Sequence, residues 1–220
     1  MNVAVGEPMT VPQFLAWEER QELRYEFDGF QTVALTGGTD AHEAIGGMLR
    51  SLLQARLQGK PCRVRGPTMK IEVMDRIRYP DAFVYCTPVA PTETVIKDPV
   101  VLFEGLSPGT SRTDRIEKLR EYQATESIER YAILEQDSIA ASVFVRHGTD
   151  WIARALTADD VLRMPEIEVE LPLSDIYADV QLAGDSDPRR SVPAPPWRRR
   201  QDPARCGRSG PAGRCTLRPQ

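Results

Sequence analysis

Two short apolar runs, residues 82–86 and 100–103, constrain the fold of this chain more than any other feature of its sequence. Both are rich in β-branched and aromatic residues and carry almost no polar side chain. Runs of this length and composition are typical of strands at the centre of a sheet, where helices cover both faces. Because a helical pattern follows at 111–125, the sequence predicts a mixed α/β or α+β domain, with a mixed sheet flanked by helices.

The other segments alternate between helical and strand-like patterns. Thr10 is a candidate N-cap for a first helix, and Thr39 or Asp40 for a second helix that Gly59 ends. Asp28-Gly29 and Gly148 are turn signals for two β-hairpins. Predicted helices cover residues 11–21, 39–60 and 111–125, and predicted strands cover 24–37, 62–74, 81–86, 100–106, 130–137, 141–156 and 167–180. The apolar helix faces are expected from Ile45, Leu49, Leu52, Leu53 and Leu57 in the second helix, and from Ile116, Leu119 and Tyr122 in the third.

Charge and composition divide the 220 residues into a domain, 1–183, and a tail, 184–220. The tail is rich in Pro, Arg and Gly, which predicts disorder. Its nine Arg and three Asp give a net charge of +6, so the overall charge of −4 leaves about −10 on the domain. An acidic body binds nucleic acid poorly without a local cationic site.

Compartment and redox state are predicted from what the sequence lacks. No run of about 18 apolar residues is present, so no membrane span is expected. The N-terminus has no basic, apolar leader pattern, which favours the cytoplasm. The four cysteines show no metal-ligand spacing, and Cys62 and Cys86 are expected to be buried or incidental thiols.

Asp81 precedes the first apolar run and Glu104 follows the second. If the two runs pair antiparallel, these acids meet at one edge of the sheet. Two carboxylates in an apolar setting are stabilised either by a shared proton or by a cation. Oxygen ligands alone favour Mg²⁺ or Mn²⁺. The alternative for each acid separately is a solvated turn residue.

Lys118 lies about one turn into the helix that follows Glu104. Its spacing from Asp114 and Tyr122 places the three on one helix face, from which Lys118 can reach back toward Glu104. A lysine beside two carboxylates can orient a water or stabilise the negative charge of a pentavalent phosphorane. The alternative is an ordinary surface ion pair between Asp114 and Lys118.

Six motifs follow one another along the chain: MTVPQFLAWEE, RYEFDG, GGTDAHEAIGGML, RYPDAFVYC, VVLFEGLSPGTSRTDRIEKLREY and ERYAILEQD. Together, in this order, they resemble the Uma-two family of restriction-endonuclease-like proteins, which belongs to the PD-(D/E)XK nuclease fold. The resemblance runs from about residue 10 to residue 180. It implies a restriction-endonuclease-like sheet and a nuclease activity.

The resemblance also implies site residues. Asp81 matches the PD acid and Glu104 the second acid, while Leu106 occupies the usual lysine position and Lys118 takes the lysine's place. Glu26 and His42 match recurrent residues of the family. Glu26 is a further candidate metal or water ligand, and His42 is either a phosphate contact or a capping or buried structural histidine. Gly105 stands where relatives carry a β-branched residue whose carbonyl helps to hold the metal, so a looser strand end is expected.

These observations predict a Mg²⁺- or Mn²⁺-dependent endonuclease that hydrolyses DNA phosphodiester bonds. The catalytic residues would be Asp81, Glu104, Lys118 and Glu26, and the metal ligands Asp81, Glu104 and Gly105. DNA is the expected partner. The oligomeric state stays open, with a homodimer as one candidate because nucleases that cut both strands are often dimers. The alternative is a catalytically inactive scaffold or a protein-interaction module, since fold resemblance does not establish activity.

Overall fold

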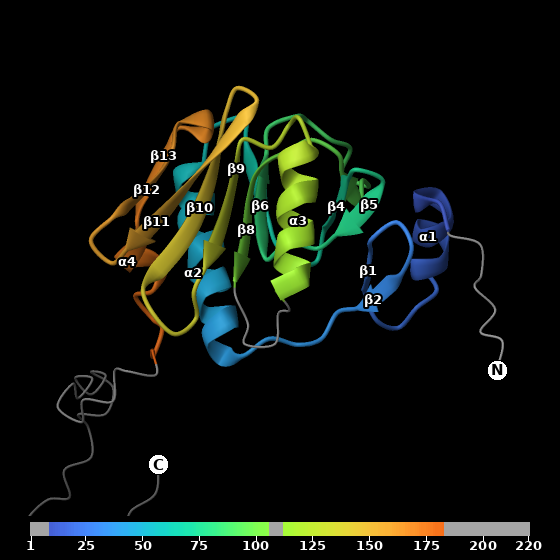
Figure 1. The fold of residues 1–220 in the computed structure, drawn as a ribbon, viewed down its shortest axis with the longest axis horizontal. Helices are drawn as coiled ribbons and strands as arrows, with labels where there is room; N and C mark the ends of the chain where they lie inside the picture. The colour runs from blue at the N-terminus through green and yellow to red at the C-terminus, as the bar shows by residue number, and fades with distance from the viewer. Residues whose placement is uncertain (1–8, 106–111, 183–220) are drawn as a thin grey trace, which may run out of the picture. The chain divides into compact units, whose positions relative to one another are not determined.

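The two apolar runs form neighbouring strands of a six-stranded sheet, as the sequence predicts (Figure 1). In the computed structural model, which describes residues 9–105 and 112–182, β6 (Ala82–Tyr85) pairs antiparallel with β8 (Pro99–Gly105). The strand order is β11-β10-β9-β8-β6-β3. The other strands are β3 (Arg63–Arg65), β9 (Arg130–Leu134), β10 (Ala140–His147) and β11 (Asp150–Thr157).

Two helices, α2 (Asp40–Arg56) and α3 (Arg112–Ala124), lie on opposite faces of this sheet (Figure 1). On one face Leu49 and Leu53 of α2 pack in a core with Val84, and on the other Tyr122 of α3 packs in a core with Phe83. Neighbouring residues of a strand point to opposite faces, so β6 contributes to both cores. All four residues of β6 are buried, which explains the lack of polar residues in this run.

A second, five-stranded sheet carries the N-terminal part of the chain and has the order β2-β1-β5-β4-β7. Its strands are β1 (Tyr25–Phe27), β2 (Thr32–Ala34), β4 (Lys70–Val73), β5 (Arg76–Arg78) and β7 (Val95–Ile96). The first helix, α1 (Val11–Glu18), begins at a capping box between Thr10 and Gln13. Phe14 of α1 stacks on Phe27 of β1, with ring centroids 5.0 Å apart, so α1 is fixed to this sheet.

The predicted strand over 167–180 is wrong in its second half. The segment enters a two-stranded sheet of β12 (Val161–Met164) and β13 (Val169–Pro172), joined by the 3₁₀ turn Pro165–Ile167, and then forms α4 (Leu173–Ile176). Leu173 and Ile176 are both buried. Their spacing of three residues fits one helical turn better than an alternating strand.

Other differences concern the edges of elements. The predicted strand over 62–74 divides into β3 and β4, which lie in different sheets, while β5 and β7 were not predicted. The first hairpin pairs Phe27 with Thr32, so its loop is longer than the predicted two-residue turn. Ile116 does not belong to the buried face of α3 and is 40% exposed. The Thr39 cap of α2 and the left-handed Gly148 of the β10–β11 hairpin are confirmed.

The expectation of free thiols at Cys62 and Cys86 is wrong in this structure, because the two form a disulfide. The residues adjoin β3 and β6, which pair antiparallel, and this pairing brings their side chains together. Disulfides persist mainly in oxidising compartments. The disulfide therefore counts against the cytoplasmic expectation, which remains a prediction.

Within residues 9–105 and 112–182, no helix is long and apolar enough to cross a membrane. The predicted boundary at residue 183 and the predicted disordered tail lie outside the described residues.

Candidate functional site

Antiparallel pairing brings Asp81 and Glu104 to the same edge of the six-stranded sheet. Ala82 of β6 lies opposite Phe103 of β8. Because Asp81 precedes Ala82 and Glu104 follows Phe103, the same register brings the two acids to one edge. Asp81 Oδ2 accepts a hydrogen bond of 2.7 Å from the main-chain N–H of Gly105, the residue after Glu104. The predicted meeting of the two strand ends is confirmed.

Lys118 of α3 lies between two carboxylates. Its Nζ is 3.3 Å from Oε1 of Glu104 and 3.3 Å from Oε1 of Glu26. The Lys118 side chain is only 12% exposed, so the geometry differs from that of an exposed surface pair; the side chain of Asp114 lies outside the described residues. Tyr122, one turn further along α3, donates a 3.2 Å hydrogen bond to Glu104 Oε1.

Glu26 is buried in β1 and is held by two groups besides its contact with Lys118. Its Oε1 accepts from the main-chain N–H of Tyr79 at 3.0 Å, and its Oε2 accepts from Arg78 at 3.2 Å. Arg78 also donates two hydrogen bonds, of 2.8 and 2.6 Å, to Glu121 of α3. Burial alone lowers the pKa of Arg78, but the hydrogen bonds and charges of Glu121 and Glu26 raise it above its usual value. The network joins β1, β5 and α3.

His42 binds Asp81 from the first turn of α2. Its Nε2 is 2.9 Å from Asp81 Oδ1, and its Nδ1 is 3.0 Å from Gln136 Nε2. Thr39 is the N-cap of α2 and donates a 2.7 Å hydrogen bond to Gln136 Oε1. The hydrogen bond to Asp81 is the main cause that raises the pKa of His42, against the opposing effect of burial. The capping alternative for His42 is therefore wrong, because the capping side chain is that of Thr39.

Comparison with known proteins identifies the family. The sequence model of the Uma2 family, described as "Putative restriction endonuclease", matches residues 11–174. The chain belongs to the Uma2 family. This range includes both acids and the side chains around them, so the family resemblance seen in the sequence is confirmed.

Two relatives of this Uma2 chain extend the comparison. The uncharacterized protein slr1290 of Synechocystis sp. is 29% identical over 169 residues, which cover 75% of this chain and 89% of that protein. The crystal structure of "a putative nuclease belonging to DUF820" from Anabaena variabilis is similar with a TM-score of 0.66 and 16% identity, over 78% of this chain and 98% of that chain. The structural likeness confirms the predicted nuclease-like fold class.

Several charged groups of this Uma2 site act on the ionisation of Glu104. Burial raises the pKa of Glu104 to about 7; Asp81 and Glu26 raise it as well, while Lys118 lowers it. A cation beside Glu104 would favour the ionised carboxylate. Among the described residues, no three His, Cys, Asp or Glu side chains are grouped closely enough to hold a metal ion. The donors nevertheless fit a hard cation, because Asp81, Glu104 and the Gly105 carbonyl offer oxygen only.

Gly105 has a packing role that the sequence does not reveal. A Cβ at this position would lie 3.0 Å from His42 Nδ1 and 3.5 Å from Asp81 Oδ2. A β-branched residue at this position would therefore press on the His42 ring. Glycine leaves room for the His42–Asp81 contact, while the predicted loosening of the strand end remains a prediction.

Several residues of the site were not predicted from the sequence. Gln136 holds His42, Arg78 holds Glu26, and Arg50 donates a 3.1 Å hydrogen bond to the main-chain oxygen of Asp81. For Tyr122 a signal exists, because it stands four residues after Lys118 and so shares its helix face. For Gln136 and Arg78 none exists, because they reach the site through strand pairings that are distant in sequence.

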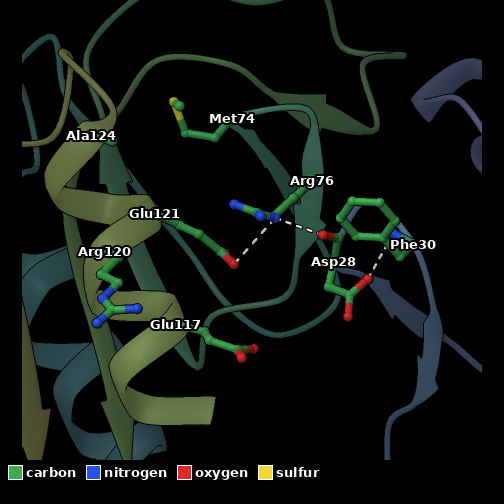
Figure 2. Close-up of a pocket in the computed structure, with 8 residues that line it drawn as sticks. All are labelled: Asp28, Phe30, Met74, Arg76, Glu117, Arg120, Glu121 and Ala124. Carbon is green, nitrogen blue, oxygen red and sulfur yellow. Dashed lines mark hydrogen bonds and ion pairs between the residues drawn. The ribbon is translucent and has the colours of Figure 1, made fainter. Parts of the chain in front are cut away.

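A cavity of about 350 Å³ lies next to this network (Figure 2). Arg76 lines it: its Nε donates to the main-chain oxygen of Asp28 at 2.6 Å and lies 3.4 Å from Oε1 of Glu121. Phe30 and Met74 line the cavity and are 74% and 53% exposed. None of the predicted site residues lines the cavity, but Glu121 does, and Glu121 is bonded to Arg78, which contacts Glu26.

Proposed function

We propose that this protein is a Mg²⁺- or Mn²⁺-dependent endonuclease that hydrolyses DNA phosphodiester bonds. Membership of the Uma2 family, described in terms of restriction endonucleases, supports a nuclease. The observation that carries the proposal is the position of Lys118, whose Nζ lies 3.3 Å from both Glu104 and Glu26 beside the strand end that bears Asp81. A DNA substrate favours a cytoplasmic location, which is part of this proposal although the Cys62–Cys86 disulfide counts against it.

Asp81, Glu104 and the main-chain carbonyl of Gly105 would hold the metal ion. When bound, the ion supplies charge neutralisation at the scissile phosphate and lowers the pKa of a water molecule. A cation also explains why an anionic Glu104 is tolerated next to Asp81 and Glu26, since burial raises the pKa of Glu104 to about 7. Each of these residues stands at or beside a strand end.

Lys118 would orient the attacking water and stabilise the negative charge that develops on the phosphate. Glu26 would help to fix the ammonium group, because it contacts Lys118 Nζ and is itself held in place by Arg78 and the N–H of Tyr79. Burial raises the pKa of Tyr122 well above its usual value, so the Tyr122 hydroxyl stays protonated and can donate to Glu104. Direct metal or water coordination by Glu26 remains a prediction.

His42 would orient Asp81. Both ring nitrogens already have partners, Asp81 at Nε2 and Gln136 at Nδ1. A phosphate contact, the role predicted from the family, would require His42 to release one of them. We therefore assign His42 to the positioning of Asp81 and keep the phosphate contact as a prediction.

Two measurements test the proposal. Mn²⁺ and Mg²⁺ titration by calorimetry should give a binding signal that Asp81→Asn and Glu104→Gln each remove. Plasmid cleavage should fall by about 100-fold or more in Lys118→Met, because removal of a group that stabilises transition-state charge typically costs this much. Lys97→Met is the matched control, since Lys97 pairs with Glu72 while 72% exposed.

Unchanged ion binding in both acid variants would contradict the metal site. Cleavage that survives Lys118→Met would contradict the role of Lys118 but would leave the metal site in place. Binding of the ion without any cleavage of plasmid or single-stranded DNA would favour the inactive scaffold.

A further inference from the structure

Strand β11 leaves a long edge of the six-stranded sheet uncovered. Among the described residues β11 pairs with β10 alone, along all eight of its residues. Six of those eight residues are exposed, and Ile152 at 43% is one of the few large apolar side chains on the surface. Unpaired edges are usually shortened or protected by Lys, Pro or a bulge. β11 has no Lys or Pro, and its pairing with β10 has no bulge.

The hydrogen-bonding groups on the outer side of β11 can be identified from its neighbour. Arg146 donates its main-chain N–H to Glu129, on the β9 side. In an antiparallel ladder the N–H and C=O of one residue point to the same side. Arg146 lies opposite Trp151, so the main-chain groups of Trp151 point away from β10. By alternation, those of Ala153 and Ala155 also point outward.

The sequence of β11 is complementary to itself. Asp150 and Arg154 stand two residues before and two residues after Ile152. Neither belongs to an ion pair with another side chain in residues 9–105 and 112–182. In an antiparallel pair of two β11 strands centred on Ile152, each Asp150 lies opposite Arg154 of the second copy.

The same register satisfies the main chain. It places Trp151 opposite Ala153 of the second copy, and both have outward-pointing N–H and C=O groups, as a hydrogen-bonded pair requires. Ile152 lies on the two-fold axis against its own copy. A two-fold contact of one surface with itself is the commonest arrangement of soluble homo-oligomers.

We propose that β11 is a dimerisation edge, on which a second copy of this chain pairs antiparallel about Ile152. The charge pairing favours a second copy of this chain as the partner. An unrelated strand would not place a basic residue opposite Asp150 and an acidic residue opposite Arg154. The interface is independent of the proposed nuclease activity and lies three strands from β8, which carries Glu104.

Sedimentation velocity of the full chain tests the proposal through charge reversal. The wild type should sediment as a dimer of the 24.7 kDa chain. Asp150→Arg and Arg154→Asp should each weaken the dimer by about tenfold, because like charges then face each other twice. The double variant should restore wild-type affinity. Arg163→Asp, which reverses an exposed charge on β12, is the control.

A proline pair tests the register. Ala153→Pro removes an N–H that points to the second copy and leaves the β10 ladder intact, so the dimer should be lost. Ala155→Pro lies outside the paired segment and should leave the dimer in place. Circular dichroism checks that each variant is folded. A wild type that remains monomeric at all concentrations, or a dimer that the single reversals do not weaken, would overturn the proposal.

Discussion

At the scale of single residues, the site depends on Glu104, whose side chain is 14% exposed and has several charged neighbours. Lys118 and Tyr122 both approach its Oε1. Gly105 and His42 fix Asp81 at the neighbouring strand end. Burial and these charged neighbours together set the raised pKa of Glu104.

The pH dependence of stability follows from Glu104. Burial raises its pKa from 4.5 to about 7 in the folded protein. Between these values the folded state holds a proton that the unfolded state releases, so stability falls as pH rises through this window. Glu104→Gln does not ionise, and its Tm should rise relative to the wild type between pH 5 and pH 8. Calorimetric melting measures this difference.

Added Mg²⁺ at pH 8 should raise the Tm of the wild type and leave Glu104→Gln unchanged. Glu170→Gln, on an exposed strand position, is the control. A Tm difference between the wild type and Glu104→Gln that stays the same at every pH would contradict the raised pKa of Glu104.

Gln136 should matter through the orientation of His42. The Thr39 hydroxyl donates to Gln136 Oε1, so Gln136 Nε2 donates to His42 Nδ1, and the neutral ring carries its proton on Nε2 toward Asp81. Gln136→Leu should weaken Mn²⁺ binding by about 10- to 100-fold, as loss of such outer contacts typically does. Calorimetry measures the affinity, and ¹⁵N NMR at pH 8 should show a mixture of His42 tautomers.

Gln54→Leu, on the exposed face of α2, controls for the substitution itself. An unchanged tautomer together with unchanged affinity would show that Gln136 only fills space.

At the scale of elements, the site is built where three of them converge. Strand β1 supplies Glu26, β8 supplies Glu104, and α3 supplies Lys118 between them. Arg78 of β5 joins β1 to α3, because it contacts Glu26 of β1 and Glu121 of α3. Glu26 of the five-stranded sheet therefore helps to position Lys118. The two predicted metal-binding acids, Asp81 and Glu104, lie at strand ends of the six-stranded sheet.

Arg78→Met should destabilise the protein by about 3–5 kcal/mol, because it leaves two buried carboxylates without their partner. Urea unfolding followed by fluorescence measures the change. Arg56→Met, at the exposed end of α2, should change the free energy of unfolding little. A loss below about 1 kcal/mol in Arg78→Met would indicate that water replaces the guanidinium.

At the scale of the whole molecule, charge limits how the proposed DNA substrate can bind. Residues 1–183 carry about −10, because residues 184–220 hold nine of the 28 basic residues but only three of the 32 acids. DNA affinity depends on cations that displace counterions from phosphates. A site in an acidic body therefore needs its own cation.

Fluorescence anisotropy with a short duplex should show weak binding in EDTA and at least tenfold tighter binding in Ca²⁺ or Mg²⁺. Glu104→Gln should not respond to the ion. Equal affinity in EDTA and in Mg²⁺ would place DNA binding elsewhere on the chain.

The strands at 82–86 and 100–103 and the helix that carries Lys118 could be predicted from the sequence, because each depends on a local pattern of apolar residues. The antiparallel pairing of the two strands was only a supposition, and the structure supplies it. The same patterns misassigned residues 173–176, where a proline ends the strand and one helical turn follows. They also missed the Cys62–Cys86 disulfide, since its formation depends on the pairing of β3 with β6.

By itself the sequence determined the nuclease-like fold class, an acid at one end of each apolar run and the helix face of Lys118. Only the tertiary structure decided which groups surround them: Arg78 and Glu26 on one side, Gln136 and His42 on the other. The physical reason is that strand and helix periodicities are local, whereas a hydrogen bond between residues 42 and 136, or between 26 and 78, exists only after distant strands have paired.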